Sequence, residues 1–157
     1  MYNTIATADS YITAHYTSRS ADRTRWAALT PEDKTVYLTN AYEAIEALPF
    51  RGRKATDGQE AAFPRLPYQY GHTGEGAPQR VLAAEAELAL WLSDEKKQKS
   101  SQKRRELQED GVKSFSIGDL SESYGDTAAV SGSVSAEKCS KAMELLAPYL
   151  TGGYEVC

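Results

Sequence analysis

The residues of this chain best suited to bind a ligand lie in one short run, 50–65, with the sequence FRGRKATDGQEAAFPR. Four cations against two acids give this run a net charge of +2. Arginine and lysine pair with phosphate groups and aromatic rings stack on bases, so the composition suits single-stranded nucleic acid. The residues concerned are Phe50, Arg51, Gly52, Arg53, Lys54, Asp57, Gln59, Glu60, Phe63, Pro64 and Arg65.

A structural role for the same run is the favoured interpretation. Arginine in a glycine-containing turn often caps the carboxyl end of a helix or pairs with a neighbouring acid, and Gly52 would supply a positive φ. Phe50 and Phe63 are expected to fill the core, not to stack on bases. The whole chain carries a net charge of -4, which also argues against extensive phosphate contacts.

The histidines and cysteines do not form a catalytic or metal-binding pattern. His15 and His72 lack the pattern of carboxylates or cysteines that a triad or a metal site needs. The run 71–76, GHTGEG, lacks the Lys-Ser/Thr ending and the preceding strand of a phosphate loop. Cys139 and Cys157 are too few for a zinc site or a disulfide framework. We therefore predict no enzyme activity, no metal and no cofactor.

Length and composition predict one domain with a modest core. The chain has 157 residues, of which 41% are hydrophobic, and a mean hydropathy of -0.55. This polar composition indicates that part of the chain is extended or becomes ordered on a partner. No apolar run is long enough to span a membrane and the first ten residues lack the pattern of a signal peptide, so we expect a soluble, cytosolic chain.

Two helices are expected in the first fifty residues. The spacing of Tyr11, Ile12 and His15 predicts a short helix over 8–16 after Thr7, followed by a loop over 17–22. A second helix should begin after Thr30, because a hydroxyl residue, a proline and two acids follow one another there. Its apolar stripe is expected to contact another element and to end before Pro49; the stripe consists of Leu38, Ala41, Ile45 and Leu48.

The centre of the core should be an alanine-rich helix that begins at Gln79 after Pro78. Its apolar face continues to Leu92, with Leu88 and Trp91 as core residues. Residues 63–77, which contain several prolines and glycines, should be irregular.

The last third of the sequence alternates between polar and periodic segments. Residues 94–110 carry six bases and five acids, which predicts a solvated charged extension. Apolar and polar residues alternate over 112–117, which predicts a β-hairpin within 112–124, and a small-residue linker over 125–135 should follow. A final amphipathic helix over 139–150 is broken near Pro148, and 151–157 forms a tail. The predicted fold is mainly α: one antiparallel helical domain over 1–150, with three main helices, a short N-terminal helix and the hairpin.

The order of these features resembles the head-to-tail adaptor, or connector, proteins of tailed bacteriophages. The resemblance covers 8–92 best and rests on Ala8-Asp9-Ser10-Tyr11, Trp26-Ala27, the run 50–65 and the helix after Pro78. The same group includes relatives labelled DnaT-like single-stranded DNA-binding proteins. The resemblance therefore implies two possible functions.

As an adaptor, the chain would be a structural virion protein, made in the host cytoplasm. The resemblance implies a ring of twelve copies that docks on the portal protein and extends the DNA channel toward a stopper or tail-completion protein. Double-stranded DNA would pass without sequence-specific contacts, and no membrane would be involved. The residues that we expect to contact the portal or another partner are Tyr149, Leu150, Tyr154 and Val156. The alternative is single-stranded DNA binding by the loop 50–65.

Overall fold

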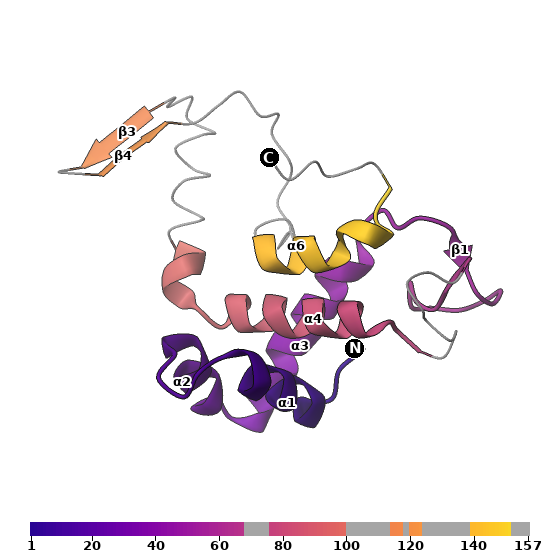
Figure 1. Cartoon of the computed structure of the whole chain (residues 1–157), viewed down its shortest axis with the longest axis horizontal. Helices are drawn as coiled ribbons and strands as arrows, with labels where there is room; N and C mark the ends of the chain where they lie inside the picture. Colours follow the sequence, from indigo (N-terminus) through magenta and orange to yellow (C-terminus); the bar gives the residue numbers. More distant parts are fainter. Residues whose placement is uncertain (68–75, 100–113, 118–119, 124–138, 152–157) are drawn as a thin grey trace. The chain divides into compact units, whose positions relative to one another are not determined.

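The computed structural model describes residues 1–67, 76–99 and 139–151, and the backbone of 114–117 and 120–123. The chain divides into two units (Figure 1). The first consists of Met1–Ser93 with Val134–Cys157, and the second of Asp94–Ser133. The described residues are mainly helical, as predicted. None of their helices has the length and apolar character needed to cross a membrane.

The first two helices differ from the sequence prediction. Helix α1 spans Ile5–His15 and begins after Thr4, not Thr7, because the two threonines cap each other: each hydroxyl accepts a hydrogen bond from the other's backbone N–H. Helix α2 spans Ala21–Ala27, so the predicted loop over 17–22 is too long. A short helix was missed here because one buried residue, Trp26, gives no periodicity.

Helix α3 spans Pro31–Glu46, and its predicted start is confirmed. The Thr30 hydroxyl accepts a hydrogen bond from the backbone N–H of Asp33 at 3.1 Å. Leu38, Ala41 and Ile45 are completely buried, whereas Leu48 lies beyond the end of the helix and is half-buried. The helix therefore delivers its apolar stripe to the core as expected.

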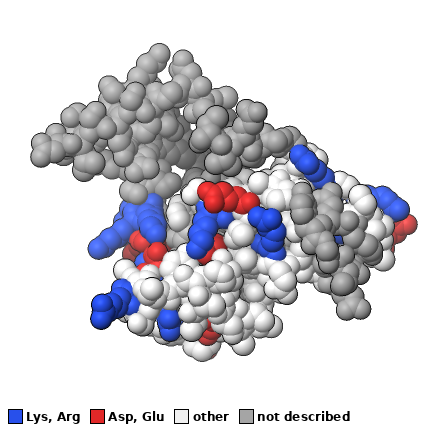
Figure 2. Space-filling view, in the orientation of Figure 1, with Lys and Arg blue, Asp and Glu red and all other residues white. Residues whose placement is uncertain are grey.

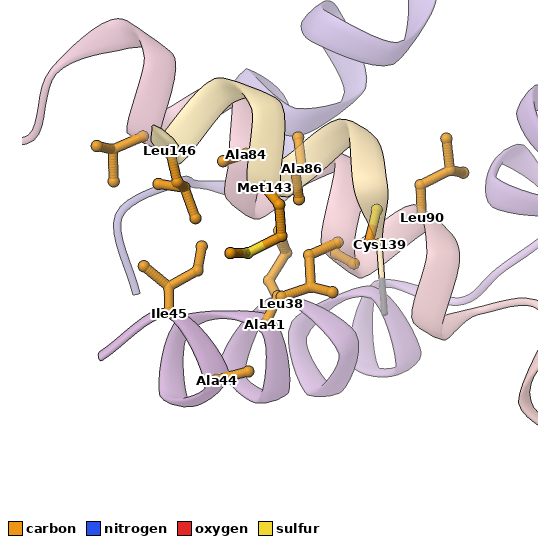
Figure 3. Packing of buried hydrophobic residues seen from close by; sticks show 14 of the residues in the cluster. Leu38, Ala41, Ala44, Ile45, Ala84, Ala86, Leu90, Cys139, Met143 and Leu146 are labelled. Carbon is orange, nitrogen blue, oxygen red and sulfur yellow. The ribbon is translucent and has the colours of Figure 1, made fainter. Parts of the chain in front are cut away.

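Helix α4 spans Gln79–Leu92 and lies at the centre of the first unit. It packs between α3 and α6, and Figure 3 shows side chains from all three helices meeting. Leu88 is completely buried, as predicted. Trp91 packs against the core but is only partly buried, so its predicted place among the core residues is confirmed only in part. Its position is at the edge of the buried face, which the broad alanine-rich stripe did not reveal.

The C-terminal helix is interrupted where proline predicted. Helix α6 spans Ser140–Leu146, and a 3₁₀ turn, η2, follows over Ala147–Tyr149, which contains Pro148. Leu146 is completely buried and Met143 nearly so. This segment closes the core of the first unit against α4.

The part of the chain that the structure describes contains two small antiparallel sheets. Strand β1, Arg53–Lys54, pairs with β2, Arg65–Leu66, and only β2 lies inside the region 63–77 that was predicted to be irregular. In the second unit, β3, Ser114–Ile117, pairs with β4, Leu120–Ser123, which confirms the predicted hairpin. Residues 95–99 of the charged extension are helical, and 100–110, like the linker, lies outside the described residues.

Candidate functional site

The loop 50–66 depends on a glycine where its backbone approaches itself most closely. Gly52 has a φ of +74°, and a Cβ atom there would lie 2.1 Å from the carbonyl oxygen of Leu66. The β1–β2 pairing brings this carbonyl close, because Arg53 is the register partner of Leu66. The predicted positive φ is thus confirmed, and a side chain at this position is excluded by contact as well as by conformation.

Arg65 holds the loop together through backbone carbonyls. Its Nε donates to the Arg51 oxygen at 2.7 Å, and one terminal nitrogen donates to the Gly52 oxygen at 2.7 Å and the Phe50 oxygen at 3.2 Å. Its other terminal nitrogen donates to the Ala62 oxygen at 3.3 Å. The guanidinium fork makes this set of contacts possible. Arg65 thus has a structural role, but it binds carbonyls of the loop instead of capping a helix end or pairing with an acid.

Lys54 and Gln59 organise the middle of the loop. Lys54 Nζ donates to the backbone oxygens of Gln59 at 2.9 Å and Glu60 at 2.7 Å. The Gln59 amide donates to the oxygens of Ala61 at 2.7 Å and Pro64 at 3.0 Å. These side chains replace regular secondary structure as the source of hydrogen bonds for the loop.

Arg51 and Arg53 are exposed, and neither bonds to another described residue through its side chain. In the described part of the chain, no ion pair joins any of the loop's four cations to a carboxylate. Cations elsewhere do form such pairs: Arg25 with Asp22, Lys34 with Asp9 and Lys141 with Glu87. Figure 2 shows basic side chains, with acidic atoms beside them, at the right edge of the molecule, where Figure 1 places β1. The loop therefore presents a net charge of +2, and its acids, Asp57 and Glu60, form no ion pair with its cations in the described part of the chain.

The two aromatic residues of the loop belong to the core. Phe50 is 8% and Phe63 is 4% exposed, and their rings meet edge to face with centroids 4.8 Å apart. Phe63 also contacts the rings of Tyr149, at 5.5 Å, and Tyr2, at 6.1 Å. Their predicted core role is confirmed. Base stacking on these rings, which the nucleic-acid interpretation of the loop required, is not available in this structure.

The C-terminal segment is attached to the same loop. Tyr149 and Leu150 are buried, and Leu150 forms a β-bridge with Phe50. Thr151 donates through its backbone N–H to the Pro49 oxygen at 2.8 Å, so the tail begins after it, not before it. The side chains of Tyr149 and Leu150 lie in the core of this chain, and partner binding by these two residues stays a prediction. Tyr154 and Val156 lie outside the described residues.

The sequence did not point to Tyr2 and Glu46, whose side chains bind backbone N–H groups of the loop. The Tyr2 hydroxyl donates to the Glu46 carboxylate and accepts a hydrogen bond from the Phe63 N–H at 3.3 Å. The Glu46 oxygens also accept from the Ala62 N–H, at 2.8 and 3.1 Å. The sequence signal was weak: Glu46 is an acid at the end of the apolar stripe of α3, and many acids at the ends of exposed helices show the same pattern.

Two further carboxylates are buried on α4. Glu85 accepts hydrogen bonds from the backbone N–H groups of Tyr2 and Asn3, at 2.9 and 2.5 Å, and from the Asn3 amide at 2.8 Å. Burial raises the pKa of Glu85, although these hydrogen bonds oppose the shift.

Glu87, two residues further along α4, has charged and phenolic partners. Its carboxylate lies 2.6 Å from Lys141 Nζ and accepts from the hydroxyls of Tyr11 at 2.8 Å and Tyr16 at 2.5 Å. Both acids thus join distant segments. The described residues contain no group of three or more potential metal ligands.

Comparison with known proteins gives one match. A search of curated proteins and a search of solved structures each found no significant match. The family model that matches covers residues 2–157, which is nearly the whole chain. This chain belongs to the family described as "Putative DnaT-like ssDNA binding protein".

Proposed function

We propose that this protein binds single-stranded DNA through phosphate contacts made by the loop 50–66. The observation that carries the proposal is the set of four cations that have no carboxylate partner in the described part of the chain. The description of the family supports the same function. Since Lys54 and Arg65 are held by backbone carbonyls, Arg51 and Arg53 are the side chains that can reach a phosphate.

Binding of this kind is weak and depends strongly on salt. With Phe50 and Phe63 buried, base stacking contributes nothing at this loop, and the affinity comes from the release of counterions. The formal charge of -4 on the whole chain lowers the affinity further. We therefore expect binding without base preference and without cooperativity.

A titration of labelled oligothymidine at several salt concentrations tests the proposal. The variant Arg51→Gln with Arg53→Gln should weaken binding and reduce the slope of log K against log salt by about 1.4, since each single-strand phosphate contact contributes about 0.7. Arg19→Gln with Lys96→Gln is the matched control, because it removes two other exposed cations. Equal losses in both variants would contradict a site at the loop.

The burial of the loop's aromatic rings favours a second candidate function. A head-to-tail adaptor needs no base stacking, and its loop needs only to be rigid enough to form a subunit interface. The resemblance of 8–92 to phage adaptors, the helical core and the separate unit that carries the hairpin support this candidate. In this role the chain would assemble as a ring between a portal protein and a stopper or tail-completion protein in the virion, without catalysis.

Co-sedimentation distinguishes the two candidates. An adaptor should sediment with purified portal rings from the same phage and appear as a ring on them by electron microscopy. Deletion after Thr151 tests whether the tail, with Tyr154 and Val156, makes this contact. Portal binding with no detectable DNA binding would favour the adaptor, and DNA binding without portal binding would favour the first proposal.

A further inference from the structure

We propose that Tyr2 and Asn3, together with Glu46 at the end of α3, act as a latch that holds the loop 50–66 in its binding conformation. In this latch Tyr2 and Glu46 are positioning residues. Neither residue contacts a ligand under this proposal. The effect of the latch on DNA affinity rests on the proposed function. Its structural half, the order of the loop, can be measured without DNA.

The contact between the latch and the loop is polar and well defined. The Tyr2 hydroxyl lies between the Glu46 carboxylate, to which it donates, and the Phe63 N–H, from which it accepts. Glu46 in turn accepts from the Ala62 N–H through both oxygens. Two consecutive loop amides are therefore satisfied only by these two side chains, which come from segments distant in sequence.

The latch is itself fixed to the central helix. Glu85 is completely buried on α4 and accepts hydrogen bonds from the backbone N–H groups of Tyr2 and Asn3. The Asn3 side chain also donates to the Leu82 oxygen at 2.6 Å. Loss of these contacts would leave a buried carboxylate without its donors, so the segment is held firmly.

The contacts continue from the latch to the cations. Phe63, whose N–H bonds to Tyr2, packs edge to face on Phe50. Arg65 lies over the Phe50 ring at 6.0 Å and binds the carbonyls of residues 50–52, next to Arg51 and Arg53. Release of the latch would free Ala62 and Phe63, and the support beneath the exposed arginines would be lost.

Tyr2→Phe removes one hydroxyl and tests the latch against a matched control. Tyr11→Phe is the control, because it too removes a tyrosine hydroxyl that donates to a glutamate carboxylate. Its acceptor is Glu87, which belongs to a cluster with Tyr16 and Lys141 and not to the loop. Hydrogen exchange of the free protein and DNA affinity are measured for both variants, together with their melting temperatures. Glu46→Gln replaces Tyr2→Phe if that variant does not fold.

The latch predicts that Tyr2→Phe speeds exchange of the amides of 55–63 and of Arg65 by about tenfold and weakens DNA binding by a similar factor. Tyr11→Phe should change neither by more than its small global destabilisation requires. Unchanged exchange at Ala62 and Phe63 in Tyr2→Phe would overturn the latch, and so would faster exchange with undiminished DNA affinity. A wild-type protein that binds no DNA would overturn the proposed function alone, because the exchange result stands independently of it.

Discussion

The charged side chains of the loop 50–66 are largely exposed, whereas two of those on helix α4 are buried. The loop keeps its cations at the surface and satisfies Lys54 and Arg65 with backbone carbonyls, so that no carboxylate neutralises them. Helix α4 buries two carboxylates and surrounds them with donors. Glu85 accepts hydrogen bonds from neutral amides and also feels the positive charge of the amino terminus, whereas Glu87 has a lysine and two tyrosines.

This difference separates charge that serves the fold from charge that is available to a partner. A buried carboxylate must be satisfied internally, since desolvation of an unpaired charge costs several kcal/mol. An exposed arginine pays no such cost and can pair with an external anion. The acids of α4 therefore belong to the architecture, and Arg51 and Arg53 remain available for binding.

The largest effect is expected from Gly52→Val, which attacks the loop's backbone. Valine would have to adopt a positive backbone φ, and its Cβ would collide with the Leu66 carbonyl oxygen. We therefore expect a loss of about 3 kcal/mol or more in unfolding free energy. Urea denaturation measures it. Gly58→Val is the control: its φ is +80°, but a Cβ there meets nothing within 4 Å, so its cost should be smaller. Equal costs would show that the close approach to Leu66 is relieved by small shifts.

A smaller effect is expected from Lys141→Met, which removes the cation from Glu87. The Glu87 side chain is 3% exposed and Lys141 is 48% exposed, so we expect a loss of about 1 to 2 kcal/mol, less than for a fully buried pair. Lys99→Met should cost almost nothing, because Lys99 and its partner Glu95 are 80% and 79% exposed. Chemical denaturation of both variants checks the contrast, and a similar small loss in each would contradict the role of burial.

The smallest effect is a change in pH dependence at Glu85. Burial raises its folded pKa above the ordinary value of 4.5, so the folded protein holds this proton more tightly than the unfolded chain. The contribution of Glu85 to stability is therefore greatest below pH 4.5 and falls as the pH rises through the folded pKa. In Glu85→Gln, stability should decline less steeply above pH 4.5 than in the wild type. Parallel slopes in urea titrations at several pH values would refute this.

Much of the fold could be predicted from local sequence patterns. Thr30 and Pro31 start α3, Gln79 starts α4 after a proline, and Pro148 interrupts the last helix, because each signal acts on its own backbone. The alternation around Phe115 and Ile117 predicted the hairpin for the same reason. Local rules failed for α2, where one buried tryptophan gives no period, and for Trp91, whose half-burial depends on the helices that pack around it.

The chemistry of the site was settled by the sequence only in part. The residue types of the loop, its net positive charge and the need for glycine at 52 follow from the sequence, since they are properties of the residues and of a tight turn. The core position of Phe50 and Phe63 was also predicted from the sequence, whereas only the tertiary structure decided which cations bind backbone carbonyls, which stay exposed, and which residues the two rings contact. Those outcomes depend on contacts with Tyr2, Glu46 and Tyr149, which come from distant parts of the chain and leave no periodic signal in it.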